Sequence, residues 1–168
     1  VSAEFTHTAP ACWGETVYFT NTPGSIPAAA LTWNFGDGAM AQDVSTVGHQ
    51  YTNPGTYEVS LIVTGTCDST LQTDVYTSLV SINAVSASFD SAPTLTCAGE
   101  TVWFTNTSVL SGTAASWLWD FGDGALDDVN WDSTSHAYAS PGEYVVVLYV
   151  TDTLGCSGWY TAAVSVEV

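Results

Sequence analysis

The 168 residues of this chain contain no lysine and no arginine, whereas seventeen are Asp or Glu, so the formal net charge is −17. The absence of cations excludes nucleic acid as a partner, because nothing in the chain can neutralise phosphate groups. It disfavours anionic membrane surfaces for the same reason. It also excludes Lys and Arg salt bridges, so stability must come from burial, backbone pairing and crosslinks.

Other absences narrow the class of protein. No apolar run is long enough for a transmembrane helix, so we expect no direct membrane insertion. No Gly-rich phosphate loop precedes a helix, and no Cys/His set has zinc spacing. No nucleophile, base and acid recur together in both halves of the chain. We therefore predict a protein that is not an enzyme and that needs no organic cofactor.

The cysteines indicate the compartment. Four cysteines in an acidic chain rich in Thr and Ser are typical of an oxidising environment. Proteases that cut after Lys or Arg find no site here, which also suits a protein outside the cell. With 46% hydrophobic residues the chain is too apolar for a disordered acidic tail. We expect folded domains at an extracellular or cell-surface location.

What the sequence does contain is an internal repeat. Three blocks occur twice in the same order: CWGETVYFTNT and CAGETVWFTNT (12–22, 97–107), WNFGDG and WDFGDG (33–38, 119–124), HQYTNPGTYEVSLIV and HAYASPGEYVVVLYV (49–63, 136–150). The period of about 84 residues predicts a tandem duplication, with domains at 1–84 and 85–168. Because the chain begins and ends in phase with this repeat, we expect one period of something longer.

Alternation of apolar and polar residues with period two dominates each copy and predicts β-strands. The expected core-facing residues include Val17, Phe19, Leu31, Trp33, Phe35, Tyr57, Val59, Leu61 and Val63, with Val102, Phe104, Trp117, Trp119, Phe121, Tyr144, Val146, Leu148 and Val150 as their counterparts. Turn signals at 36–38, 53–55 and 140–142 separate the strands. Short strands at this spacing predict an all-β chain with one β-sandwich per copy.

The repeated pattern W-[ND]-F-G-D-G followed by H-x-Y-x-x-P-G-x-Y-x-V-x-L resembles the polycystic-kidney-disease (PKD) domain, over both halves almost end to end. The resemblance implies two tandem immunoglobulin-like sandwiches, common in prokaryotic surface proteins, that act as spacers, adhesion modules or enzyme accessories. It also implies a structural hydrogen bond at His49 and His136. The short connection 83–86 holds no Pro or Gly, so we expect the domains to stack end to end as a semi-rigid rod.

Two weaker sites are also predicted. Calcium is the one metal that the acidic loops could bind, with Asn34, Asp37, Asp120 and Asp123 as candidate ligands near Asp43, Asp127 and Asp128. The alternative is that the Asp37 and Asp123 carboxylates accept hydrogen bonds from turn amides. Asn106 begins the sequon Asn-Thr-Ser and is a glycosylation candidate.

Four cysteines allow three pairings. In the fold that the resemblance implies, the second and sixth strands run the same way. Cys12 and Cys97 precede the second strand, and Cys67 and Cys156 follow the sixth, so partners within one repeat would lie at opposite ends of a domain. We therefore predict Cys12 with Cys156 inside the chain, and Cys67 and Cys97 bonded to neighbouring units. The alternative is Cys12 with Cys67 and Cys97 with Cys156.

The copies differ on the outward face of the third and sixth strands. Copy one has Thr32, Glu58, Ser60 and Ile62, whereas copy two has Leu118, Val145, Val147 and Tyr149. These four apolar residues predict an interaction patch, unless the loop 125–135 covers it.

Two functions from different classes fit the sequence. The first is a structural repeat unit of an extracellular fibre or long adhesin stalk, whose partners are copies of itself or adjacent repeats. The second is a carbohydrate- or protein-binding accessory module of a secreted hydrolase, which would grip surface glycans with exposed Trp13, Trp103, Trp131 and Trp159. The phase of the termini favours the first.

Overall fold

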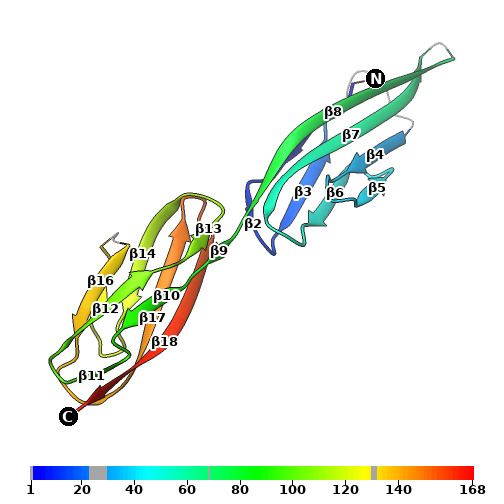
Figure 1. Ribbon diagram of the computed structural model, residues 1–168. Coiled ribbons are helices and arrows are strands. Elements are labelled where there is room, and N and C mark those ends of the chain that lie inside the picture. Colours follow the sequence, from blue (N-terminus) through cyan, green and yellow to red (C-terminus); the bar gives the residue numbers. More distant parts are fainter. Residues whose placement is uncertain (1, 23–29, 68, 130–131) are drawn as a thin grey trace. The chain divides into compact units, whose positions relative to one another are not determined.

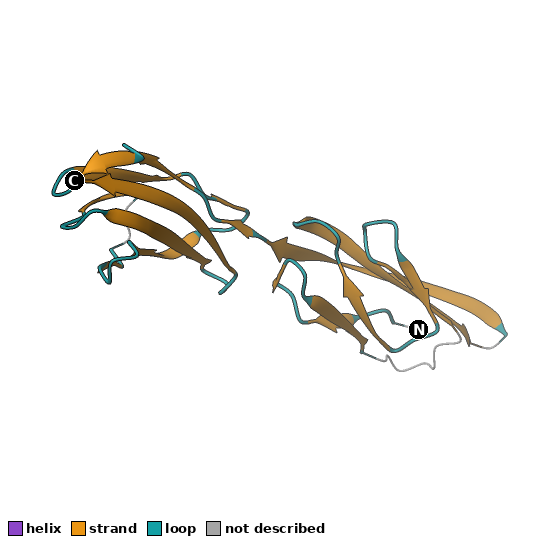
Figure 2. Cartoon of the chain, turned by 90° about the horizontal axis from the view of Figure 1, so that it is seen from below, coloured by secondary structure: helices purple, strands orange, loops and turns teal. Residues whose placement is uncertain are grey.

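A computed structural model describes residues 2–22, 30–67, 69–129 and 132–168, apart from the side chain of Cys67. The chain divides into two compact units, Val1–Asn83 and Ala84–Val168, each described below by itself (Figure 1). The described elements are strands joined by loops and turns (Figure 2), as the alternation predicted. No helix in the described residues is long and apolar enough to cross a membrane.

Unit 1 is a sandwich of two sheets. One sheet has the order β1-β3-β6, formed by β1 (Phe5–His7), β3 (Thr16–Asn21) and β6 (Thr46–Gln50). The other has the order β2-β8-β7-β4-β5, formed by β2 (Ala11–Cys12), β8 (Thr70–Asn83), β7 (Gly55–Cys67), β4 (Ala30–Asn34) and β5 (Met40–Gln42).

Unit 2 repeats this architecture. Its first sheet is β10-β12-β16, formed by β10 (Phe89–Ala92), β12 (Thr101–Asn106) and β16 (Ser133–Ala137). Its second is β11-β18-β17-β14-β15, formed by β11 (Leu95–Cys97), β18 (Ser157–Glu167), β17 (Gly142–Asp152), β14 (Ala114–Asp120) and β15 (Leu126–Asp127). A short added pair joins β9 (Val85–Ser86) to β13 (Val109–Leu110).

The core of each unit lies between its two sheets. It is formed mainly by the residues that the apolar–polar alternation predicted to face inward. Trp33 and Trp119 are fully buried, and each meets a phenylalanine of the first strand edge-on, with ring centroids 5.2 Å apart. Most of the other predicted core positions are also buried, whereas Leu31, Tyr57, Trp117 and Tyr144 are partly exposed at the margins. The predicted β-sandwich in each copy is confirmed.

The connection between the copies is shorter than the expected residues 83–86. Strand β8 runs from Thr70 to Asn83, because it pairs with β7 without a break down to Cys67 opposite Thr70. Strand β9 occupies Val85–Ser86, and β10 begins at Phe89. Only Ala84 separates β8 from β9.

Candidate functional site

The repeated Gly-Asp-Gly loop of unit 1 follows β4 and is held by an aspartate and a histidine. Asp37 Oδ1 accepts a hydrogen bond from the Ala39 amide at 3.0 Å, and Asp37 Oδ2 accepts one from His49 Nε2 on β6 at 2.7 Å. Asn34 Oδ1 accepts the amide of Gly36 at 3.0 Å. We call the Asp37–His49 pair, with its counterpart in unit 2, the Asp–His clamp.

Aromatic rings fix the histidine of the clamp. The His49 ring stacks on Phe35, with centroids 4.2 Å apart and an interplanar angle of 7°. Tyr51 packs edge-on against His49, and its hydroxyl donates to the Phe35 carbonyl at 3.1 Å. The clamp thus joins the loop after β4 in one sheet to β6 in the other.

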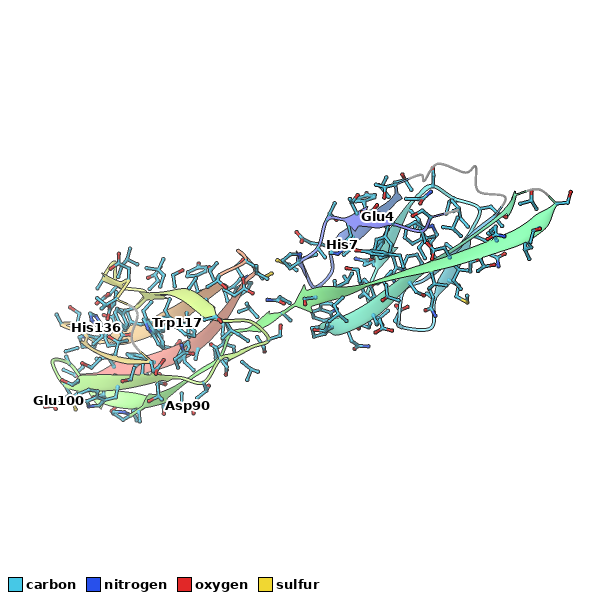
Figure 3. All side chains as sticks on the ribbon, turned by 90° about the horizontal axis from the view of Figure 1, so that it is seen from above. Glu4, His7, Asp90, Glu100, Trp117 and His136 are labelled. Carbon is cyan, nitrogen blue, oxygen red and sulfur yellow. The ribbon has the colours of Figure 1, made fainter. Side chains whose placement is uncertain are left out.

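Unit 2 builds the same clamp from different chain segments. His136 on β16 (Figure 3) donates to Asp123 Oδ2 at 2.7 Å, and Asp123 Oδ1 accepts the Ala125 amide at 3.0 Å. The His136 ring stacks on Phe121 at 4.3 Å. The hydrogen bond expected at His49 and His136 is therefore found in both copies. In each unit it ties the Gly-Asp-Gly loop of one sheet to a strand of the other sheet.

In the clamp, hydrogen bonds and the nearby histidine lower the pKa of each aspartate by more than burial raises it. Burial raises the pKa of Asp37, but the Ala39 amide and the His49 imidazole favour the charged carboxylate and hold its pKa below the usual range. Asp123 behaves alike: burial raises its pKa, and His136 and the Ala125 amide lower it by more. Burial, with the nearby Asp37 charge, raises the pKa of Tyr51, so this hydroxyl remains a donor.

The side chains proposed as calcium ligands accept hydrogen bonds within these turns. Asn34 and Asp120 each accept the amide two residues ahead, and Asp37 and Asp123 use both carboxylate oxygens in the clamp. Asp43 and Asp127 also accept backbone amides. In the part of the chain that is described, no three His, Cys, Asp or Glu side chains gather as a metal site would require. The geometry favours the alternative, turn-fixing role.

The cysteines lie at opposite ends of each unit. In unit 1, Cys12 pairs with Asn83 at the end of β8, and Cys67 pairs with Thr70 at its start. Thirteen residue steps of β8 separate these two positions (83 − 70), which is roughly 43 Å at about 3.3 Å per residue.

Unit 2 follows the same plan. Cys97 pairs with Glu167 near the end of β18, whereas Cys156 directly precedes the first residue of that strand, Ser157. A disulfide needs Cα atoms about 4–7 Å apart, so a bridge within either repeat cannot close in this fold. Cys12 and Cys156 are each disulfide-bonded, and Cys97 is a free, exposed thiol. The pairing of Cys12 with Cys156 stays a prediction.

The outward side of the second sheet in unit 2 carries apolar side chains on four strands, with Asp120 between Leu126 and Val147 and with Thr161 beside Val147. Strand register places Leu118 beside Tyr149 and Tyr149 beside Trp159, with Val147, Val145 and Leu126 on the same side. Val145 is 56% exposed, Tyr149 45% and Trp159 67%. We call Leu118, Leu126, Val145, Val147, Tyr149 and Trp159 the apolar face. Comparing the sequences of the two copies predicted four of these residues as a patch. It did not include Leu126 and Trp159, which lie on the neighbouring strands β15 and β18.

The matching side of unit 1 carries more polar residues. Thr32, Glu58, Ser60 and Ile62 hold the positions of Leu118, Val145, Val147 and Tyr149, as the sequence comparison stated. Strand β8 adds exposed Leu71, Val75 and Leu79, but Thr73 and Thr77 alternate with them on this side. Unit 1 thus has polar residues at three positions where unit 2 has Leu118, Val145 and Val147, whereas Thr77 of β8 is matched by Thr161 of β18.

The glycosylation candidate and the tryptophans proposed to bind glycans do not form one site in the described residues. Asn106 Oδ1 accepts the Ser108 amide at 2.9 Å, and its Nδ2 is buried, so the atom that would carry a glycan is not accessible in the folded chain. Trp103 is 61% exposed on β12, in the other sheet from Trp159. Trp13 is exposed and donates to the Thr52 carbonyl. Trp131 lies outside the described residues.

Two immunoglobulin-like sandwiches with a repeated Asp–His clamp define the class of protein, and comparison with known families gives its family. The model of the PKD domain matches residues 2–80 and 86–168, so this chain belongs to the PKD domain family. The chain resembles the PKD1 domain of Vibrio cholerae metalloprotease PrtV, at 32% identity over 51% of this chain and 99% of that one, with a TM-score of 0.44. It resembles the PKD1 domain of Vibrio anguillarum Epp at 32% identity over 51% and 95%, also with a TM-score of 0.44.

A third similar structure comes from a study of the promiscuous specificity of carbohydrate-binding modules of the β-sandwich superfamily. It is 36% identical over 50% of this chain, with a TM-score of 0.48, and the match spans only 34% of that chain. PKD domains occur in surface proteins and as accessory modules of secreted hydrolases, and the matched domain is not catalytic. A PKD tandem that contains a disulfide indicates a secreted or surface protein.

Proposed function

We propose that this chain is a non-catalytic structural repeat unit of an extracellular fibre or of a long surface adhesin stalk. The supporting observation is the position of the cysteines: each unit carries one near either end of one long strand, β8 in unit 1 and β18 in unit 2. A module with a thiol at each end can be linked head to tail, and its own two thiols are too far apart to react with each other.

The linkage follows from this arrangement. Cys12 pairs with Cys156 across the internal junction, and Cys97 pairs with Cys67 of the following unit. The free and exposed thiol of Cys97 is available for such a bond. Each covalent link also restricts the unfolded chain, which stabilises a protein that has no Lys or Arg salt bridges.

Oxidation of the purified chain tests this function. In a glutathione redox buffer the wild type should form a ladder of multiples that a reducing agent collapses to monomer. Cys97→Ser should remain monomeric, whereas Ser165→Ala, a conservative change on the neighbouring strand β18, should form the same ladder. A wild type that stays monomeric under oxidation, with Cys97 still reactive toward a thiol reagent, would contradict the proposal.

A second candidate, an accessory module of a secreted hydrolase, is supported by the exposed indoles of Trp103 and Trp159. The sequence of the full-length gene separates the two functions, because a fibre or stalk predicts further repeats in phase, whereas an accessory module predicts an attached catalytic domain.

A further inference from the structure

The turn between β17 and β18 holds Cys156 through a buried aspartate. Asp152, the last residue of β17, is 2% exposed, and its Oδ1 atom accepts the Cys156 amide at 2.8 Å and the Leu154 amide at 2.9 Å. The Asp152 amide donates to the Cys156 carbonyl at 2.8 Å, and the Gly155 amide donates to the Asp152 carbonyl at 3.1 Å. The side chain and the backbone of Asp152 thus close the turn together and fix the backbone of Cys156.

Unit 1 shows that the sandwich shared by both units does not require this aspartate. Gly65 stands where unit 2 has Asp152, since each follows the third repeated block after one threonine. Beyond Gly65, β7 and β8 continue to pair until Cys67 lies opposite Thr70, whereas β17 ends at Asp152. The carboxylate therefore belongs to the compact turn that carries Cys156, and not to the common fold.

A buried carboxylate is costly in this chain. No Lys or Arg exists to pair with it, and a buried polar group destabilises a fold unless hydrogen bonds satisfy it. Asp152 receives such bonds from the turn, including one from Cys156, which is itself 3% exposed and disulfide-bonded. The aspartate is therefore buried beside a residue of the bridge and is bonded to it.

The other disulfide-bonded cysteine has a contact of the same kind. The Cys12 amide donates to Glu15 Oε2 at 2.9 Å, and the Glu15 amide donates to the Cys12 carbonyl at 3.0 Å. In unit 2 the matching Glu100 amide donates to the carbonyl of the free Cys97 at 3.1 Å, but in the described part of the chain the Glu100 carboxylate accepts no bond from the Cys97 amide. A carboxylate that holds the cysteine amide thus accompanies both bonded cysteines and is missing at the free one.

We propose that Asp152 is a positioning residue for the disulfide of Cys156. A disulfide tolerates only a narrow range of Cα separations and torsion angles, so a cysteine whose backbone is already fixed loses less conformational freedom when the bridge closes. When glutathione disulfide is the oxidant, one S–S bond forms between Cys156 and its partner thiol, and two molecules of the thiol GSH are released. The inference rests on the proposed function, because the bridge of Cys156 is one of the links between units.

The equilibrium between the thiol and the disulfide of Cys156 tests this inference. The full chain with Cys97→Ser, as the parent, is equilibrated at several ratios of GSH to glutathione disulfide, and free thiols are then alkylated. Mass spectrometry of chymotryptic peptides gives the fraction of Cys156 bonded to another cysteine of the protein, whichever that is. Fixing the backbone of one residue changes an equilibrium constant about five- to thirtyfold. Asp152→Ala, which frees the turn, should therefore lower the constant for bridge formation about tenfold.

Two variants separate positioning from general stability. Asp152→Asn keeps an oxygen that can accept from Cys156 and Leu154, so it should restore most of the constant. Asp123→Ala is the matched control, because it removes the carboxylate of another turn of unit 2, at the opposite end of β14 from Asp152. It should lower the stability of unit 2 in urea and leave the Cys156 equilibrium unchanged.

A further variant covers the case in which Asp152→Ala does not fold. Gly155 has φ +88°, and nothing lies within 4 Å of an added Cβ. Gly155→Ala therefore strains the same turn through its backbone alone, and it should also lower the constant for bridge formation. Circular dichroism confirms that each variant is folded.

An unchanged constant in folded Asp152→Ala would overturn the inference, as would equal losses in Asp152→Ala and Asp123→Ala. If Asp152→Ala does not fold, an unchanged constant in Gly155→Ala overturns it. These results are distinct from a failure of the proposed function. A bridge between Cys156 and Cys67 would contradict the head-to-tail linkage and leave the role of Asp152 intact, whereas a bridge to Cys12 that forms equally well without Asp152 would sink only the inference.

Discussion

Replacing Gly122 with Ala tests the loop that carries the Asp–His clamp. Gly122 has φ +80°, and an added Cβ would lie 2.5 Å from the Val145 carbonyl oxygen and 3.1 Å from its nitrogen. The left-handed backbone costs an L-residue about 1–2 kcal/mol, and a clash with backbone atoms that cannot rotate away adds about 1–3 kcal/mol. We therefore expect unit 2 to lose about 2–5 kcal/mol, a large part of the stability of a small domain.

Gly124 provides the matched control, because its φ of +95° is also left-handed but nothing lies within 4 Å of an added Cβ. Gly124→Ala should therefore show the backbone cost alone. Urea unfolding followed by tryptophan fluorescence reports on the buried Trp119. Gly36→Ala should cause the same loss in unit 1, where the Cβ would lie 2.6 Å from the Glu58 carbonyl oxygen. If Gly122→Ala were as mild as Gly124→Ala, the close approach between this loop and β17 would be refuted.

Three further predictions concern acid, calcium and shape. The folded-state pKa values of Asp37 and Asp123 lie below 3.8, the ordinary value for an Asp side chain. Both carboxylates therefore stabilise the fold above that pH, and this stability is lost as the pH falls through the lowered values. Urea titrations from pH 6 to pH 2 should show the loss, and the double variant Asp37→Asn with Asp123→Asn should show a smaller one. Adding calcium or EDTA should leave the melting temperature unchanged, since the candidate oxygens already accept amides; a clear rise with calcium would restore the metal site. Small-angle scattering should fit a semi-rigid rod, because one residue separates β8 from β9, and a profile that requires freely reorienting domains would count against it.

The sequence predicted the features that depend on local pattern. Alternation identified the buried sides of β3, β4 and β7, since side chains of a strand point to opposite faces at every step. The Asp-Gly pairs predicted turns in which Asp37 and Asp123 accept amides, and these hydrogen bonds are found.

Features that depend on pairing between strands were not predicted in full. The extension of β8 back to Thr70 carries little apolar alternation, and its length comes from hydrogen bonding to β7. Trp159 and Leu126 joined the apolar face only once the neighbours of β17 and β14 were known. The expectation that Cys12 and Cys67 lie far apart needed strand directions, and the β8 register now gives the distance.

Disulfide mapping under non-reducing conditions tests the central claim most directly. Chymotrypsin cuts after aromatic residues and so separates Cys67 from Cys97 at Tyr76 and Phe89, which lie between them in the sequence. Mass spectrometry of the oxidised protein should recover a peptide joining Cys12 to Cys156 and another joining Cys97 to Cys67. Recovery of Cys12 joined to Cys67, or of Cys97 joined to Cys156, would contradict the account of a unit built for head-to-tail linkage.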